Sequence, residues 1–397
     1  MPETPQNPPR RPAAARPGRS TTRGWRIGTL DGAPVIVTAG WLLIAAVLVA
    51  LVGPQLQARL DAGPVAYLWA LAVPALLFVS VLAHELAHGF AARSRKVPVR
   101  EYVITLWGGH TSFTSGLRTP ADSAIVSVAG PAANLALAGI GWFLGDGLPG
   151  LPGLAMAAFT YTNAFVGVFN LLPALPLDGG KLLEAAIWAI RSDRITGTLV
   201  AARAGQVLAV VILVGSIGWP LLQGQRPSVL TAVWAALVAG VLWTGAQGAL
   251  RQAQAQQRAR DVDLDRLATG AHVLPTSGTV ADADRVLAAT PSVGIVLVDG
   301  KGRPTALVDR RALAQVPGQG RDQVPLSAVA HTVPPAALVT QTRGPEAVAQ
   351  VARAAQAGAA VVILIGLAGQ GQGTGRAQVL GLVPIAQVVH LLGGPRA

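Results

Sequence analysis

The chain has 397 residues and no cysteine, which excludes disulfides, thiolate metal sites and a cysteine nucleophile. Hydrophobic residues make up 51% and charged residues 13%, about half of the share in a soluble globule, so the composition indicates an integral membrane protein. The net charge of +12 does not indicate nucleic-acid binding, because the basic residues cluster beside the apolar segments.

The length predicts two or three structural units. Residues 1–28 are rich in Pro, Ala and Arg. We expect a disordered cytoplasmic N-terminus there rather than a cleaved signal peptide, because the apolar stretch that follows is long. Residues 29–250 are predicted to form a membrane domain, 251–261 a polar linker, and 262–397 a soluble α/β domain.

Six apolar segments are long enough to cross a hydrocarbon core, which takes about 20 helical residues. They cover residues 34–53, 65–92, 123–144, 154–190, 199–222 and 229–250, and the fourth is interrupted at 173–180. The predicted fold class is therefore a polytopic α-helical membrane protein with a C-terminal α/β tandem domain.

The basic residues give the orientation of the predicted spans. Among those that flank the segments, only Arg59 and Arg226 lie on one side of the topology, and the others lie on the opposite side. Because Lys and Arg collect on the cytoplasmic side of a membrane, both termini are expected in the cytoplasm. The expected location is the plasma membrane.

The second apolar segment contains the motif His84-Glu85-Leu86-Ala87-His88. Positions i and i+4 of a helix share one face, so His84 and His88 can present two imidazoles to one zinc ion. Glu85 lies beside them and can carry a proton. In a lipid-embedded helix such polar side chains need partners, which strengthens the interpretation as a metal site.

A two-histidine zinc site takes a third protein ligand and leaves one position for water. Asp178 is the favoured candidate, because Pro173 and Pro176 forbid a regular helix before it. An irregular backbone at membrane depth is tolerated only where it lines a cavity or is buried in protein. His110 is the competing candidate, and it lies in a predicted hairpin without apolar enclosure.

Residues 101–115 are rich in β-forming residues, with Gly108-Gly109 as a turn. They predict a short hairpin at the membrane surface, and an ordinary interfacial loop is the alternative.

Two asparagines in apolar segments are candidate site residues. Asn170 can donate to a developing oxyanion, or it can cap its helix or contact a neighbouring helix. Asn134 has the same two interpretations with equal weight, and Glu184 is expected to be a structural partner.

Together these motifs resemble those of the site-2 protease family, the intramembrane zinc metalloproteases. The matching segments are the HExxH motif, Gly108-Gly109, Gly130-Pro131 with Asn134, and the run from Asn170 to Asp178-Gly179-Gly180. The resemblance implies that His84, His88 and Asp178 bind zinc and that Glu85 is the general base. It also implies that Asn170 supports the transition state, and we expect Gly108, Gly109 and Asn134 to contact substrate.

The soluble region contains two similar stretches. Each has a helix followed by a strand, a turn or loop, and a second strand, with the helices at 280–289 and 345–357. This tandem pattern suggests a two-lobed regulatory module and resembles a pair of cystathionine-β-synthase (CBS) domains. Ala306 to Arg310 and Gly381 to Pro384 depart from the usual CBS nucleotide motif, which argues against adenine-nucleotide binding. A homodimer through these domains is an expectation of the resemblance.

The expected function is hydrolysis of a peptide bond in or near a transmembrane segment of another membrane protein. The resemblance suggests a membrane-anchored regulator of the anti-sigma-factor type as substrate, in regulated intramembrane proteolysis. A zinc-binding scaffold or transporter without catalysis is the alternative. A serine protease of the rhomboid type is discarded, because no histidine lies in a later span to activate Ser216.

Overall fold

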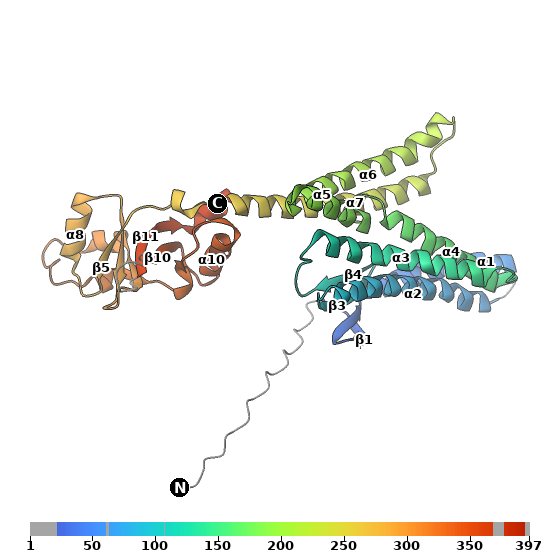
Figure 1. The fold of residues 1–397 in the computed structure, drawn as a ribbon, viewed down its shortest axis with the longest axis horizontal. Coiled ribbons are helices and arrows are strands. Elements are labelled where there is room, and N and C mark those ends of the chain that lie inside the picture. The colour runs from blue at the N-terminus through green and yellow to red at the C-terminus, as the bar shows by residue number, and fades with distance from the viewer. Residues whose placement is uncertain (1–21, 61–62, 107, 368–376, 394–397) are drawn as a thin grey trace, which may run out of the picture. The chain divides into compact units, whose positions relative to one another are not determined.

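The computed structural model describes residues 22–60, 63–106, 108–367 and 377–393. It divides into two compact units, Met1–Leu250 and Arg251–Ala397 (Figure 1). The strands of the first unit are β1 (Trp25–Leu30), β2 (Ala33–Val37), β3 (Val99–Thr105) and β4 (Gly108–Phe113). Its helices are α1 (Ala39–Leu60), α2 (Val65–Ser94), α3 (Pro120–Gly145), α4 (Gly150–Asn170), α5 (Asp178–Arg191), α6 (Arg194–Leu222) and α7 (Val229–Asp261), which continues into the second unit.

Six helices of the described residues are long and apolar enough to cross a membrane, namely α1 to α4, α6 and α7. The prediction of a polytopic α-helical membrane protein is thereby confirmed. The interrupted fourth segment consists of two helices, α4 and the shorter α5, separated by residues 171–177. The polar stretch 251–261, expected as a linker, is the helical end of α7.

The N-terminal part of the first unit differs from the prediction. Residues 25–28, expected in the disordered segment, belong to β1, and 33–37, expected at the start of the first span, form β2. These strands make an antiparallel hairpin in which Leu30 pairs with Ala33 around Asp31-Gly32. An Asp-Gly pair between β-forming residues is a hairpin signal that the sequence contained. Residues 1–21 lie outside the described residues.

The hairpin expected between the second and third spans is present. β3 and β4 pair antiparallel, and β2 joins them in parallel, giving the sheet order β1-β2-β3-β4. Gly108 and Gly109 begin β4 and pair with Thr105 and Ile104, so both glycines are in the strand and do not form the turn. The sheet packs on α2 (Figure 1). The side chain of Tyr102 on β3 is fully buried in the cluster formed there.

The segment between α4 and α5 is held in an irregular path because Pro173 and Pro176 cannot continue a helix. The Leu175 N–H donates to the Ala201 carbonyl of α6 at 3.0 Å, and Pro176 packs beside Gly245 of α7. These contacts fix the start of α5, where Asp178 is the first residue. The predicted break and the predicted carboxylate therefore occupy one place in the fold.

The second unit contains two α/β halves, as the repeated pattern predicts. Its helices are α8 (Val280–Ala289), α9 (Arg310–Gln315), α10 (Gly344–Gln356) and α11 (Ile385–Leu391), with short 3-10 helices at Leu264–Arg266, Leu326–Val329 and Pro335–Ala337. Its strands are β5 (Ala271–Pro275), β6 (Gly294–Val298), β7 (Pro304–Val308), β8 (Ala330–Thr332), β9 (Leu338–Val339), β10 (Val361–Leu367) and β11 (Ala377–Pro384).

The two halves of the second unit have separate sheets, with strand orders β5-β6-β7-β8 and β11-β10-β9. Buried Val296, Ile363 and Leu382 form a cluster that joins the two sheets. The second half is therefore packed on the first through apolar strand residues. Most of the Gly/Gln-rich loop predicted at 366–375 lies outside the described residues.

Candidate metal centre

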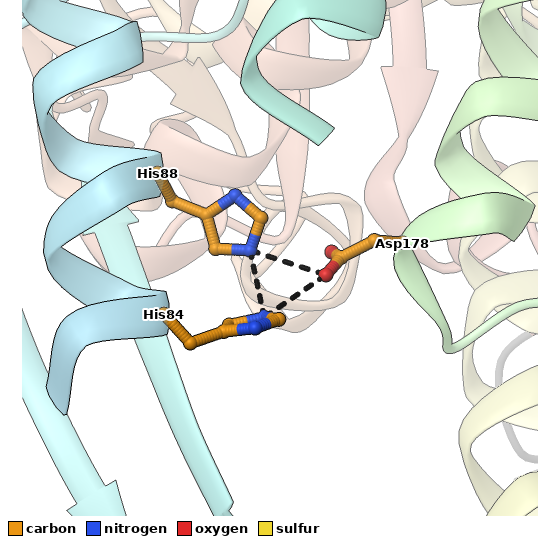
Figure 2. A group of neighbouring side chains, drawn as sticks. All are labelled: His84, His88 and Asp178. Atoms are coloured by element: carbon orange, nitrogen blue, oxygen red, sulfur yellow. Dashed lines mark hydrogen bonds and ion pairs between the residues drawn. The ribbon is translucent and has the colours of Figure 1, made fainter. Parts of the chain in front are cut away.

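His84, His88 and Asp178 converge at the boundary between α2 and the first turn of α5 (Figure 2). The two histidines project from the same face of α2, four residues apart, as the helical period requires. Their Nε2 atoms lie 3.1 Å from each other, and each lies 3.1 Å from Oδ2 of Asp178. The predicted trio is thus brought together from two helices that are far apart in the sequence.

The other ring nitrogen of each histidine is held by a carbonyl oxygen. His84 Nδ1 lies 2.5 Å from Oδ1 of Asn134, and His88 Nδ1 lies 2.7 Å from the Val126 carbonyl. A carbonyl oxygen only accepts hydrogen bonds, so each Nδ1 carries the proton in the neutral ring. Each Nε2 is then unprotonated and directs its lone pair toward the other ligand atoms.

The three residues fit a zinc ion. Two unprotonated Nε2 atoms and a carboxylate oxygen, 3.1 Å apart, repel one another unless a cation lies among them. Ligand atoms about 2.0–2.1 Å from a tetrahedral zinc ion are about 3.3 Å apart, close to this spacing. A second observation supports the same interpretation: a Cβ on Gly130 of α3 would overlap both Nε2 atoms, so only glycine leaves these atoms clear.

Glu85 lies beside the trio and is buried, with 4% of its surface exposed. Its Oε2 accepts a hydrogen bond of 2.7 Å from the Thr111 hydroxyl of β4. Gly109 of β4 also lies against this side chain, and a Cβ there would overlap the Glu85 carboxylate. The hairpin is therefore packed directly on Glu85. Gly109 is one of the residues predicted at the site, whereas Thr111 is not, because no spacing in the sequence distinguishes it.

The amides expected at the site have different surroundings. Asn134 is buried and uses Oδ1 for His84 and Nδ2 for Asn163, so it positions a histidine, and the substrate contact expected of it stays a prediction. Asn170 donates to the Val166 carbonyl in its own helix, and the structure records no hydrogen bond from it to the trio among the described residues. Its contacts agree with the helix-end alternative.

The remaining candidates lie apart from the trio. His110 is exposed on β4 and pairs with Val103, outside the group of ligand atoms formed by the described residues. Glu184 accepts a hydrogen bond of 2.7 Å from Arg194 and is buried, as expected of a structural partner. Gly108 precedes Gly109 in β4, and a Cβ on it would meet nothing within 4 Å.

Comparisons with known proteins agree with this centre. The sequence model of peptidase family M50 matches residues 72–152 and 151–214. Rip3 of Mycobacterium tuberculosis, named as a zinc metalloprotease, is 31% identical over 271 residues, covering 66% of this chain and 68% of Rip3. The protein sll0528 of Synechocystis, also named as a zinc metalloprotease, is 28% identical over 320 residues, covering 77% of this chain and 82% of that protein.

Solved structures match each unit in part. A site-2 protease from Methanocaldococcus jannaschii covers 57% of this chain and 95% of its own, with 22% identity and a TM-score of 0.41. A conserved CBS domain protein from Thermoplasma acidophilum covers 32% of this chain and 68% of its own, with 18% identity and a TM-score of 0.23. The extent of the Rip3 match decides the family: this chain belongs to peptidase family M50 and is a zinc metalloprotease of the site-2 type.

Proposed function

We propose that the protein hydrolyses a peptide bond within or near a transmembrane segment of a membrane-anchored regulatory protein. The observation that carries the proposal is the convergence of Asp178, at the start of α5, with His84, His88 and Glu85 of α2, a helix that is apolar enough to cross a membrane. Ionisable groups at such a depth are costly, so they are retained for function. This location and the family support the proposed substrate class.

His84, His88 and Asp178 would hold one zinc ion. When bound, the ion would act as a Lewis acid that polarises a carbonyl and makes water more acidic. Glu85 takes the proton from the attacking water and passes it to the leaving nitrogen. The contact with Thr111 holds the carboxylate on the side of the hairpin, and the buried surroundings limit its alternative positions.

Strand β4 is the proposed binding edge for substrate. In the described part of the chain β4 pairs only with β3, so its other edge is unpaired. An extended segment can add to such an edge through backbone hydrogen bonds. A helical substrate would have to unwind before it could do so, because its peptide groups are engaged in its own helix. Gly109 and Thr111 of β4 both contact Glu85, so a strand added there passes close to the proposed base.

The distribution of basic residues supports a cytoplasmic site. Arg93, Arg95 and Lys96 follow the histidines at the end of α2, and cytoplasmic ends of spans carry such residues. We therefore propose that both termini are cytoplasmic and that the centre lies at the cytoplasmic end of α2. The plasma membrane is the proposed location. The second unit would then be cytoplasmic and available for regulation.

The alternative function is a zinc-binding scaffold or transporter that performs no hydrolysis. Both functions require the three ligands, but only proteolysis requires Glu85. The test compares membrane-protein fragments that accumulate in cells producing the wild-type protein and Glu85→Gln. We expect the variant to retain zinc and to accumulate an uncut substrate. Identical fragment patterns with equal zinc content would favour the scaffold.

A further inference from the structure

A line of buried polar side chains extends from His84 away from the metal centre. It crosses three helices, from Asn134 on α3 to Asn163 on α4 and Ser80 on α2, with exposed fractions of 1%, 0% and 4%. Asn134 Nδ2 donates to Asn163 Oδ1 at 2.8 Å, and Asn163 Nδ2 donates to Ser80 Oγ at 2.9 Å. Buried polar groups in a membrane domain are expensive unless they are fully paired.

Two backbone carbonyls fix the direction of these hydrogen bonds. Asn163 Nδ2 also donates to the Phe159 carbonyl at 2.9 Å, and the Ser80 hydroxyl donates to the Leu76 carbonyl at 2.9 Å. If the Asn163 amide were rotated by half a turn, its Oδ1 would face the Phe159 carbonyl, and two acceptors would meet without a proton. Only one orientation of Asn163 therefore satisfies its surroundings.

The orientation of Asn163 determines that of Asn134. Because Asn163 presents its oxygen to Asn134, Asn134 must present its NH₂ group in return. The Asn134 oxygen then faces His84 Nδ1, which must carry a proton to form the contact of 2.5 Å. His84 Nε2 is left without a proton on the side of Asp178 and His88.

The opposite arrangement would disable the centre. An Asn134 amide turned by half a turn would offer its NH₂ group to His84 and favour the proton on Nε2. That proton would point into the group of ligand atoms, where Nε2 lies 3.1 Å from both His88 and Asp178. A histidine protonated on Nε2 cannot bind a metal through that atom. The neutral tautomer of His84 is thus decided by a residue that does not touch it.

We propose that Asn163, anchored by Phe159 and Ser80, is a positioning residue that holds His84 in its metal-binding tautomer through Asn134. This inference rests on the proposed role of His84 as a zinc ligand. Asn163 lies about two turns before the end of α4 and belongs to none of the motifs singled out in the sequence. Its function follows only from its contacts in the fold.

The test measures the zinc dissociation constant by chelator competition, in full-length protein carrying Glu85→Gln so that no proteolysis occurs. Asn163→Leu removes the anchor at nearly constant volume. We expect its zinc affinity to fall by about 10- to 100-fold, as for other residues that orient a metal-binding side chain without binding the metal. Thr160→Val is the matched control. Thr160 lies on the same helix with 7% of its surface exposed, and its hydroxyl has no hydrogen-bond partner among the described residues, so zinc affinity should not change.

A second substitution separates tautomer control from packing. Asn134→Asp places a carboxylate, which accepts hydrogen bonds in either orientation, next to His84. By itself it should weaken zinc binding, because its oxygen meets the Asn163 oxygen. In the double variant Asn134→Asp/Asn163→Leu, more than half of the zinc affinity lost in Asn163→Leu should return, measured on a logarithmic scale. The carboxylate accepts the proton of His84 Nδ1 in either orientation and so no longer needs Asn163 to orient it.

The outcomes are distinct. Equal zinc affinity of Asn163→Leu and the Glu85→Gln parent would overturn the inference and leave the proposed function intact. A loss that Asn134→Asp does not repair would assign Asn163 a packing role, which also overturns it. A parent that binds no zinc would contradict the proposed function itself. If Asn163→Leu does not reach the membrane, Asn163→Ala takes its place, both alone and combined with Asn134→Asp.

Discussion

Lys181 Nζ lies 3.1 Å from Oδ1 of Asp178, whereas the two histidine nitrogens face the other oxygen of the same carboxylate, Oδ2. The two residues are three positions apart in the first turn of α5, where their side chains are neighbours. Lys181 thus occupies one oxygen of Asp178 and leaves the other for the proposed metal. Both carboxylate oxygens of Asp178 therefore have a defined neighbour.

Removing the Lys181 amine should therefore loosen Asp178. For Lys181→Met we expect the zinc dissociation constant to rise about tenfold, as for other groups that orient a ligand. Lys181→Arg keeps a cation and should lose less zinc affinity than Lys181→Met. Chelator competition with the Glu85→Gln protein gives the measurement, and Lys301→Met in the second unit is the control. Unchanged affinity in Lys181→Met would show that Asp178 is oriented without it.

Thr111 should matter for turnover and not for zinc retention. Its hydroxyl donates to Glu85 Oε2, and hydrogen bonds to charged groups contribute about 1.5–3 kcal/mol. We expect Thr111→Val to lower kcat about tenfold or more with zinc content unchanged, and Thr111→Ser to restore most of the rate. Thr114→Val is the control: Thr114 directly follows β4, its hydroxyl donates to the Pro98 carbonyl, and the variant should cleave at the normal rate. A normal rate in Thr111→Val would remove Thr111 from the positioning of Glu85.

The identity of the third ligand can be tested by metal content alone. Asp178→Ala removes a ligand atom that lies 3.1 Å from both histidine nitrogens, so the purified protein should retain almost no zinc. His110→Ala should retain it fully, because His110 is exposed on β4. The measurement is the zinc-to-protein ratio after dialysis against a weak chelator. If Asp178→Ala kept its zinc and His110→Ala lost it, His110 and not Asp178 would be the third ligand.

The trio could be predicted because its members carry local signals. The histidine spacing matches one helical face, and the prolines before Asp178 break a helix that is otherwise apolar. Lys181 is three residues from Asp178, where an ion pair across one turn can be anticipated. The spans themselves follow from hydropathy, since every backbone group in lipid must be paired within a helix.

Asn163, Ser80 and Thr111 could not be predicted in this way. Each is a single polar residue without a periodic pattern, and its partner comes from another helix or strand. Asn170 shows a related limit. It has a suitable residue type beside the broken helix, and in the structure its amide donates to the Val166 carbonyl of its own helix, so its role at the transition state stays a prediction. Sequence spacing indicates which residues share a face and does not indicate which acceptor an amide chooses.

Gly130 brings the backbone of α3 close to the two histidine rings of the proposed metal centre. A Cβ on this residue would overlap Nε2 of both His84 and His88, whereas a Cβ on Gly139 of the same helix would meet nothing within 4 Å. Gly130→Ala should therefore displace the imidazoles and reduce zinc affinity by about fivefold or more, since inserting a methyl group into a packed site costs about 1–3 kcal/mol. Gly139→Ala adds the same methyl group to the same helix and should bind zinc normally. Chelator competition on both proteins measures the difference, and equal affinities would mean that the histidines adjust to a side chain at Gly130 and that the centre is less rigid than its contacts imply.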